Sequence, residues 1–365
     1  MQTTKKKRIV GLDVLRILLA FLIFLFHSRV HLGCSYGLLN NFIESGSLAM
    51  SAFFMLSGYC LQFTHDKKIA TNFTLKEFYL KRLIAIYPLY FFTGTLFVTM
   101  CIAAGKQTIF DNLLLLPIEI LGLQAIFTNS LFPYAHNSGT WFISCLLICY
   151  ISFPLLQSLL SIPSKLGGGK LLFMSAAFLI LAPIIVVHFN LTSIYTNPFY
   201  RLVEFNAGII LAQINLHNNQ ATRSKWMYNW GNFWIVSIVL VVGVSLFRRW
   251  GISNNAIIVE PSFFIIILLM GTLSFPKIFH TKLLSYLSKI SYAFFLGQFF
   301  IWHPTKFLLQ LIPSIPNILI ILGTLIGCII IAVILYEFVE KKSSNFFTKL
   351  ILSKWKPSDP KSLFL

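Results

Sequence analysis

The chain has 365 residues, of which 57% are hydrophobic and only 11% are charged, and its formal net charge is +18. With a mean hydropathy of +0.79, this composition excludes an ordinary soluble domain and predicts an all-α integral membrane protein. Lysine-rich loops that face anionic lipid produce such a charge by themselves, so the charge gives no reason to expect a nucleic-acid partner.

About ten apolar stretches are long enough to cross a bilayer as helices, since a hydrocarbon core requires roughly 20 residues. In chain order they are residues 9–32, 46–63, 83–104, 140–160, 171–189, 199–216, 232–247, 256–273, 290–311 and 315–338. The stretch 112–127 is also apolar, but Pro117 and Glu119 interrupt it. We expect an interfacial or re-entrant segment there, and an eleventh span stays open.

Basic residues set the expected orientation, because cytoplasmic loops retain an excess of Lys and Arg. The lead at residues 5–8 and the segment after residue 338 are both basic, so we expect both termini in the cytoplasm. The first apolar run continues for a full span, which argues against a cleavable signal peptide. We divide the chain into a membrane domain, residues 1–342, and a basic cytoplasmic tail, residues 343–365.

Asp13, Arg16 and His27 lie along the first predicted span, with Arg29 and His31 at its outer end. Ionisable groups inside a span are costly and indicate function. Arg16 and His27 are eleven residues apart, so they differ by about 20° around a helix axis and by about 16 Å along it. They therefore share one face, with Arg16 nearer the cytoplasm and His27 near the outer edge. Asp13 is placed to neutralise Arg16. Alternatively, Arg16 and His27 extend to the two membrane interfaces.

The six cysteines mostly fall inside predicted spans, where they behave as small apolar residues. Cys145 and Cys149 share a helix face, but further ligands are missing nearby, so we expect neither a disulfide framework nor a metal site.

Seven short motifs occur in a definite order along the chain. The first is Asp13-x-Leu15-Arg16 followed by His27; the others are FFMLSGYCL, FYLKRLIAIYPLY, TWFISCLLICYISFPLL, NPFYRLVEFNAGIILA, KISYAFFLGQ and YEFVEKK. Together they resemble the acyltransferase-3 family of membrane-bound O-acyltransferases from residue 11 to about residue 342. The chain departs from that family at Ala85, where many members have a second Arg, and at Gln298, which replaces the usual His.

The resemblance implies an enzyme of the cytoplasmic (inner) membrane with multiple spans. It would transfer an acyl group, usually acetyl, from cytoplasmic acyl-coenzyme A to a sugar hydroxyl of a cell-surface polysaccharide, such as an O-antigen, or of its lipid-linked precursor. His27 would be the general base that takes the hydroxyl proton. Arg16 would act electrostatically on the coenzyme or the pore wall, and Asp13 would support it. Acetyl-coenzyme A would be a co-substrate, with no metal, and the oligomeric state stays open.

Other motif residues have a possible role in binding and a simpler structural alternative. Lys81 and Arg82 would bind coenzyme phosphates; alternatively, they only anchor the topology. Ser57 would line the donor site; alternatively, Ser57 and Gly58 only let two helices approach closely. The predicted acceptor-binding residues are Trp141, Arg201, Glu204 and Gln298. Here the alternatives are an Arg201–Glu204 ion pair and an interfacial role for Trp141.

A second class of function is a transporter or flippase for a polysaccharide or its precursor, because buried Arg, His and Glu also suit a translocation pathway. Against it, the sequence shows no inverted repeat. A purely structural membrane subunit would leave the shared face of Arg16 and His27 unexplained.

Overall fold

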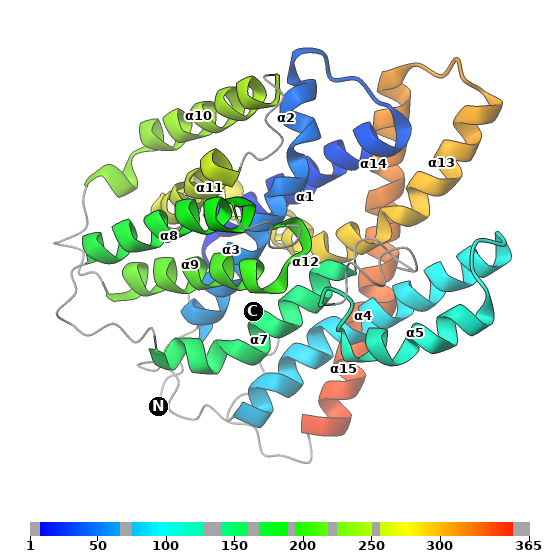
Figure 1. Cartoon of the computed structure of the whole chain (residues 1–365), viewed down its shortest axis with the longest axis horizontal. Coiled ribbons are helices and arrows are strands. Elements are labelled where there is room, and N and C mark those ends of the chain that lie inside the picture. Colours follow the sequence, from blue (N-terminus) through cyan, green and yellow to red (C-terminus); the bar gives the residue numbers. More distant parts are fainter. Residues whose placement is uncertain are drawn as a thin grey trace. The chain divides into compact units, whose positions relative to one another are not determined.

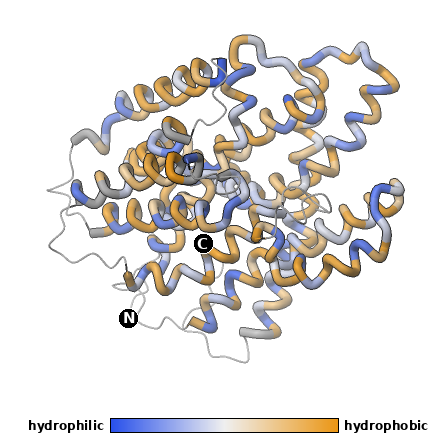
Figure 2. The backbone as a smooth tube through the Cα atoms, in the orientation of Figure 1, coloured by the Kyte–Doolittle hydropathy of each residue, from blue (hydrophilic) through white to orange (hydrophobic). Residues whose placement is uncertain are grey.

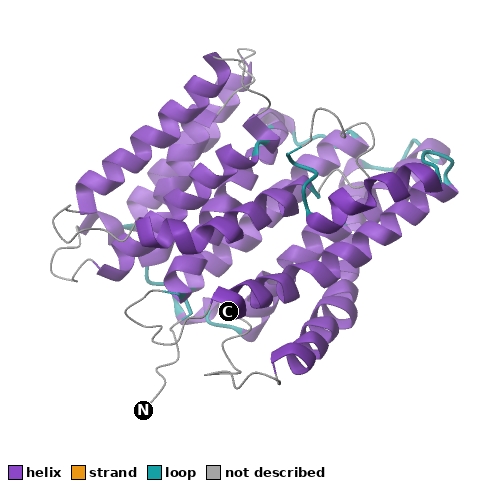
Figure 3. Cartoon of the chain, turned by 60° about the horizontal axis from the view of Figure 1, so that its bottom comes forward, coloured by secondary structure: helices purple, strands orange, loops and turns teal. Residues whose placement is uncertain are grey.

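The computed structural model describes residues 8–65, 75–126, 140–159, 168–188, 194–217, 225–249 and 256–352. Regular structure in these ranges is helical, and no strand occurs among them (Figures 1 and 3). This confirms the predicted all-α class. The chain forms two compact units: unit 1 comprises Met1–Ile69, Leu155–Ile194 and Val203–Ser291, and unit 2 comprises Ala70–Pro154, Tyr195–Leu202 and Tyr292–Leu365.

Unit 1 contains the first helix and the helices that pack around α11. Its helices are α1 (Val10–Leu32), α2 (Asn40–Glu44), α3 (Ala49–Thr64), α8 (Gly168–His188), most of α9 (Pro198–His217), α10 (Trp230–Arg249), α11 (Ala256–Thr272) and the first part of α12 (Lys282–Gly297). Helix α1 packs against α3 and α11, and α10 packs against α11 and α2. The sequence stops α1 at Gly33, whose left-handed backbone lets its N–H bond the last carbonyls of the helix.

Two glycines let α3 and α9 cross with their backbones in contact. A Cβ atom at Gly58 would collide with the Phe205 carbonyl, and one at Gly208 would collide with the Met55 carbonyl. Small residues permit this close approach inside membranes, where lipid provides no hydrophobic force between helices. Close helix packing, the structural alternative given for Ser57 and Gly58, therefore explains why residue 58 is a glycine.

Unit 2 contains α4 (Leu75–Ala103), α5 (Ile109–Leu121), α7 (Trp141–Leu159) as far as Pro154, α13 (Phe299–Leu311) and α14 (Asn317–Ile334). After α14 the helix continues through a π-helical turn, η7 (Leu335–Glu340), into α15 (Lys341–Phe347) and η8 (Thr348–Leu352). Helix α5 begins with a capping box of Thr108 and Asp111 and packs on α4, where the Tyr90 hydroxyl donates to the Glu119 carbonyl at 2.7 Å.

Among the residues that the structure describes, six helices are long and apolar enough to cross a membrane: Val10–Leu32, Gly46–Thr64, Leu75–Ala103, Trp141–Leu159, Trp230–Arg249 and Asn317–Leu350. Each overlaps a predicted span, although Leu75–Ala103 begins eight residues before the predicted 83–104 and Asn317–Leu350 ends twelve residues after the predicted 315–338. Hydrophobic residues run along these helices in Figure 2. The protein is thus a multi-pass membrane protein, while the count of about ten spans and the orientation of the termini stay predictions.

The predicted span 290–311 is not one helix. It is divided between α12 and α13, and the break lies at Gln298, directly after Gly297, a weak helix former. In residues 112–126, the described part of the predicted segment 112–127, the helix ends at Leu121, where Gly122 stops α5 in the left-handed conformation. The predicted domain boundary at 342/343 falls within a continuous helix, and residues 353–365 of the predicted tail lie outside the described residues.

Candidate active site

Arg16 and His27 lie on one uninterrupted helix, α1. Because α1 is unbroken between them, they are about 16 Å apart along its axis. Two groups at that separation cannot contact the same atom, but they can flank an extended substrate. Both side chains are partly buried.

The guanidinium of Arg16 lies in a small polar cluster of unit 1, which we call the Arg16 cluster and which consists of Arg8, Asp13, Arg16, Cys60 and Ser288. Arg16 Nη1 donates to Ser288 Oγ at 3.4 Å, and Arg16 Nη2 donates to Cys60 Sγ at 3.6 Å. The Ser288 hydroxyl in turn donates to Asp13 Oδ1 at 2.7 Å. Asp13 Oδ2 forms an ion pair with Arg8 Nε.

The expectation that Asp13 neutralises Arg16 directly is wrong, since within the described part of unit 1 no carboxylate pairs with Arg16. Arg8 precedes α1, and its side chain forms the ion pair with the Asp13 carboxylate. A hydroxyl therefore stands between Asp13 and Arg16.

His27 lies near the other end of α1, beside aromatic rings of the same helix. Its ring stacks on His31, with 5.3 Å between the ring centroids and 17° between the planes, and the Phe26 ring is 5.1 Å away. These neighbours restrict the orientation of the imidazole, and a defined orientation is what a general base needs.

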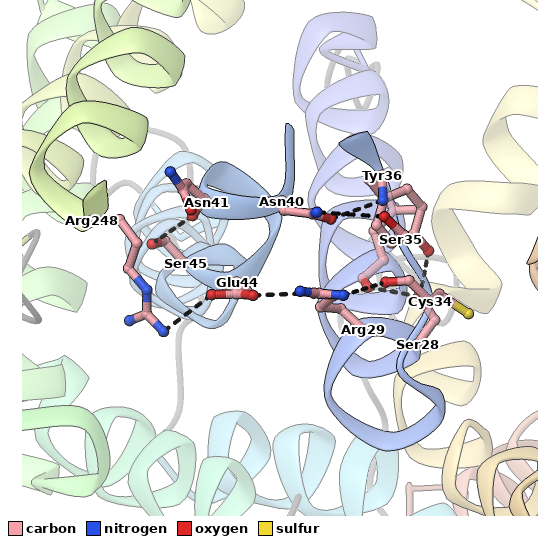
Figure 4. Close-up of polar contacts among 11 residues, drawn as sticks. Ser28, Arg29, Cys34, Ser35, Tyr36, Asn40, Asn41, Glu44, Ser45 and Arg248 are labelled. Atoms are coloured by element: carbon pink, nitrogen blue, oxygen red, sulfur yellow. Dashed lines mark hydrogen bonds and ion pairs between the residues drawn. The ribbon is translucent and has the colours of Figure 1, made fainter. Parts of the chain in front are cut away.

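The connection that follows α1 is fixed by a polar network, shown in Figure 4. Glu44 lies between two arginines, accepting from Arg29 Nε at 3.1 Å and from Arg248 Nη2 at 3.4 Å. Arg29 Nη1 also donates to the Cys34 carbonyl at 3.1 Å. The network joins the end of α1, which carries His27, to α2 and α10, so the position of that end does not depend on α1 alone.

Two further groups of this connection stay protonated near neutral pH. Burial raises the pKa of the Tyr36 hydroxyl and of the Cys34 thiol. The Tyr36 hydroxyl therefore keeps its proton for the hydrogen bond with Ser28 Oγ, and Ser28 belongs to the turn of α1 that follows His27.

Ser57, predicted to line the donor site, lies on α3 and is partly buried. It is one turn before Cys60, whose sulfur contacts Arg16. The fold thus brings Ser57 close to the Arg16 cluster along α3.

In unit 2, Lys81 and Arg82 belong to the second turn of α4 rather than to the end of a loop, because α4 already begins at Leu75. Lys81 Nζ forms an ion pair with Glu77 at 2.7 Å, a spacing of four residues that favours the helix. Arg82 lies over the Tyr150 ring, 6.0 Å from its centroid, and Arg82 Nε has no hydrogen-bond partner among the described residues. Of the two, Arg82 is the better placed to bind a phosphate.

Arg201, at the start of α9, is 1% exposed and lies among three aromatic rings of unit 2. Its guanidinium carbon is 5.6 Å from the Trp141 ring centroid and 5.5 Å from that of Tyr195, with Tyr200 at 5.8 Å. Arg201 Nε and Nη2 both donate to the Tyr195 carbonyl, at 3.0 and 2.8 Å. Burial raises the pKa of Tyr195 to about 12, so its hydroxyl stays neutral.

The remaining predicted residues are fully buried. Glu204 is 0% exposed on α9, one turn after Arg201. Gln298 is also 0% exposed, and neither atom of its amide has a hydrogen-bond partner among the described residues. A buried amide without partners costs free energy unless a ligand or water satisfies it.

The structure thus groups the predicted residues in three places: Asp13, Arg16 and Ser57 near the Arg16 cluster, Trp141 with Arg201, and Lys81 beside Arg82. His27 is about 16 Å along α1 from Arg16, Gln298 lies between α12 and α13 in unit 2, and Glu204 lies on α9 in unit 1. Sequence reasoning missed Ser288 and the role of Arg8. The sequence presents Arg8 only as the last residue of a basic lead, and no local signal identifies Ser288, which is 275 residues from Asp13.

Comparison with protein families gives one match: the family model of the acyltransferase domain of the acyltransferase-3 family covers residues 9–337. Neither the curated proteins nor the solved structures gave a match. The match includes all of α1 and ends in the π-helical turn after α14.

Proposed function

The chain belongs to the acyltransferase-3 family and is an acyltransferase, and from this premise we propose that it transfers acetyl from cytoplasmic acetyl-coenzyme A. The proposed acceptor is a sugar hydroxyl of a cell-surface polysaccharide, such as an O-antigen, or of its lipid-linked precursor, and the proposed location is the inner membrane. The family match over nearly the whole chain is the observation that carries this proposal.

The proposed reaction begins when His27 removes the proton from the acceptor hydroxyl. The hydroxyl oxygen attacks the thioester carbonyl, a C–O bond forms, and the C–S bond breaks. The coenzyme leaves as a thiolate and takes up a proton, so the products are an ester and a free thiol. A sugar hydroxyl is a weak nucleophile near neutral pH, which is why a positioned base accelerates the attack.

The other residues are assigned by chemistry. Arg16 attracts an anionic group of the donor, and Asp13 supports Arg16 through Ser288. Arg82 with Lys81 binds coenzyme phosphates, and Ser57 is also assigned to donor binding. The buried amide of Gln298 is assigned to hydroxyl groups of the acceptor, since an amide both donates and accepts hydrogen bonds. Acceptor binding is also assigned to Trp141, Arg201 and Glu204.

Purified protein in lipid nanodiscs, supplied with acetyl-coenzyme A and surface glycan, tests the proposal. We expect free thiol to appear only with the glycan present, and mass spectrometry to find acetyl ester on glycan from cells that carry the gene and not from cells that lack it. A transporter would change the amount of surface glycan without adding ester, and that result would overturn the proposal.

A further inference from the structure

The Arg16 cluster contains two arginines, Arg8 and Arg16, but a single carboxylate, that of Asp13. The carboxylate of Asp13 is already paired with Arg8, so these two charges offset each other. The two contacts of Arg16 within the described part of unit 1 are with a hydroxyl and a thiol, both neutral. Arg16 is therefore a cation without a counter-charge in the part of unit 1 that the structure describes.

Such a cation is costly inside a membrane span unless water or an anionic group reaches it. Had Asp13 paired directly with Arg16, the two charges would have cancelled. The Ser288 hydroxyl bridges the two groups instead, because it donates to Asp13 and accepts from Arg16 at the same time. It holds Arg16 in place by a hydrogen bond while the positive charge stays available.

Ser288 is well suited to hold a side chain still. It is 2% exposed and belongs to α12, and its hydroxyl has one partner as donor and one as acceptor. Its two contacts join α12 to α1, across 275 residues of sequence. A hydrogen bond to a charged group is worth more than one between neutral groups.

We propose that Ser288 is a positioning residue for acyl transfer: its hydroxyl separates Asp13 from Arg16 and orients the uncompensated guanidinium toward an anionic oxygen of the acyl donor. This inference rests on the proposed function, because it takes an acyl-coenzyme A as the donor. It adds a residue from α12 to the proposed site on α1.

The test compares Ser288→Ala, Ser288→Thr and Arg16→Lys, each alone, with the double variant Ser288→Ala/Arg16→Lys, in nanodiscs with acetyl-coenzyme A. Ser288→Ala should lower kcat/KM by roughly tenfold to hundredfold, the usual value of one hydrogen bond to a charged group. It should change the same parameter, KM or kcat, that Arg16→Lys changes. The double variant should be no worse than the worse single variant, since both changes remove one interaction.

Ser288→Thr keeps the hydroxyl and should recover most of the activity. Ser291→Ala is the matched control, because Ser291 is also buried on α12 but its hydroxyl donates only to the Ser288 carbonyl of its own helix, at 2.8 Å. It should leave both parameters within twofold.

Three outcomes would overturn the inference while the proposed function stands: near-normal kinetics of Ser288→Ala, a multiplicative loss in the double variant, or equal losses in Ser288→Thr and Ser288→Ala. A parent protein that releases no thiol and modifies no glycan would instead overturn the proposed function, and this inference with it.

Discussion

His27 is the residue on which the proposed chemistry depends, because it is the group assigned to accept the hydroxyl proton. Its ring is oriented by His31 and Phe26, and the end of α1 that carries it is fixed by the Glu44 network. The imidazole ring of His27 is therefore already oriented before a substrate binds.

Replacing His27 by Ala should lower turnover by about 10² to 10⁴, the usual contribution of a positioned general base. His27→Gln should do no better, because an amide keeps a hydrogen bond but cannot accept the proton. Thiol release by purified variants measures this effect. The control is His280→Ala, an exposed histidine in unit 1, and near-normal glycan acetylation by stably expressed His27→Ala would contradict the assignment.

Arg82 and Lys81 should contribute unequally to donor binding. Arg82→Gln should raise the KM for acetyl-coenzyme A several-fold and weaken its dependence on salt, because a phosphate contact is lost. Lys81→Gln should have a smaller effect, since Glu77 already offsets its charge. Steady-state kinetics at two ionic strengths measure both.

The control for these variants is Lys282→Gln at the exposed start of α12. An unchanged KM in correctly inserted Arg82→Gln protein would leave both residues as topology anchors.

At the scale of the elements, helix length and helix contact explain features that single residues do not. The helix from Asn317 to Leu350 has 34 residues, which is about 51 Å at 1.5 Å per residue. A hydrocarbon core is about 30 Å thick, so part of this helix extends beyond it. The apolar run ends near residue 338, and we expect Lys341, Lys342 and Lys349 in the part outside the core.

The crossing of α3 and α9 gives a prediction about stability. Gly58→Ala or Gly208→Ala should destabilise the protein by roughly 1–3 kcal/mol, because the added methyl group meets backbone that cannot move away. The midpoint of thermal unfolding in detergent measures the effect.

Gly94→Ala and Gly323→Ala are matched controls for these variants. Both glycines lie in helices with open space at the Cβ position, so alanine should be neutral or stabilising by about 0.5–1 kcal/mol. Equal midpoints for Gly58→Ala and Gly94→Ala would contradict the close crossing.

At the scale of the whole molecule, the orientation in the membrane is a prediction from the basic residues. A reporter fused after Leu365 should be cytoplasmic, and one inserted near Asn40, in the connection after α1, should be outside. Reporter activity in intact cells measures each position. An external signal at Leu365 would mean an odd number of spans, and the predicted topology would then be wrong.

The sequence by itself determined the all-α class, the membrane location, the family, and the placement of Asp13, Arg16 and His27 on one helix. These properties depend on composition, hydropathy and spacing within single segments, which the chain carries locally. Only the tertiary structure decided which groups those residues contact. Arg8 takes the Asp13 carboxylate, Ser288 stands between Asp13 and Arg16, and three aromatic rings surround Arg201. Side-chain hydrogen bonds across 275 residues depend on how helices pack, and no local pattern encodes that packing.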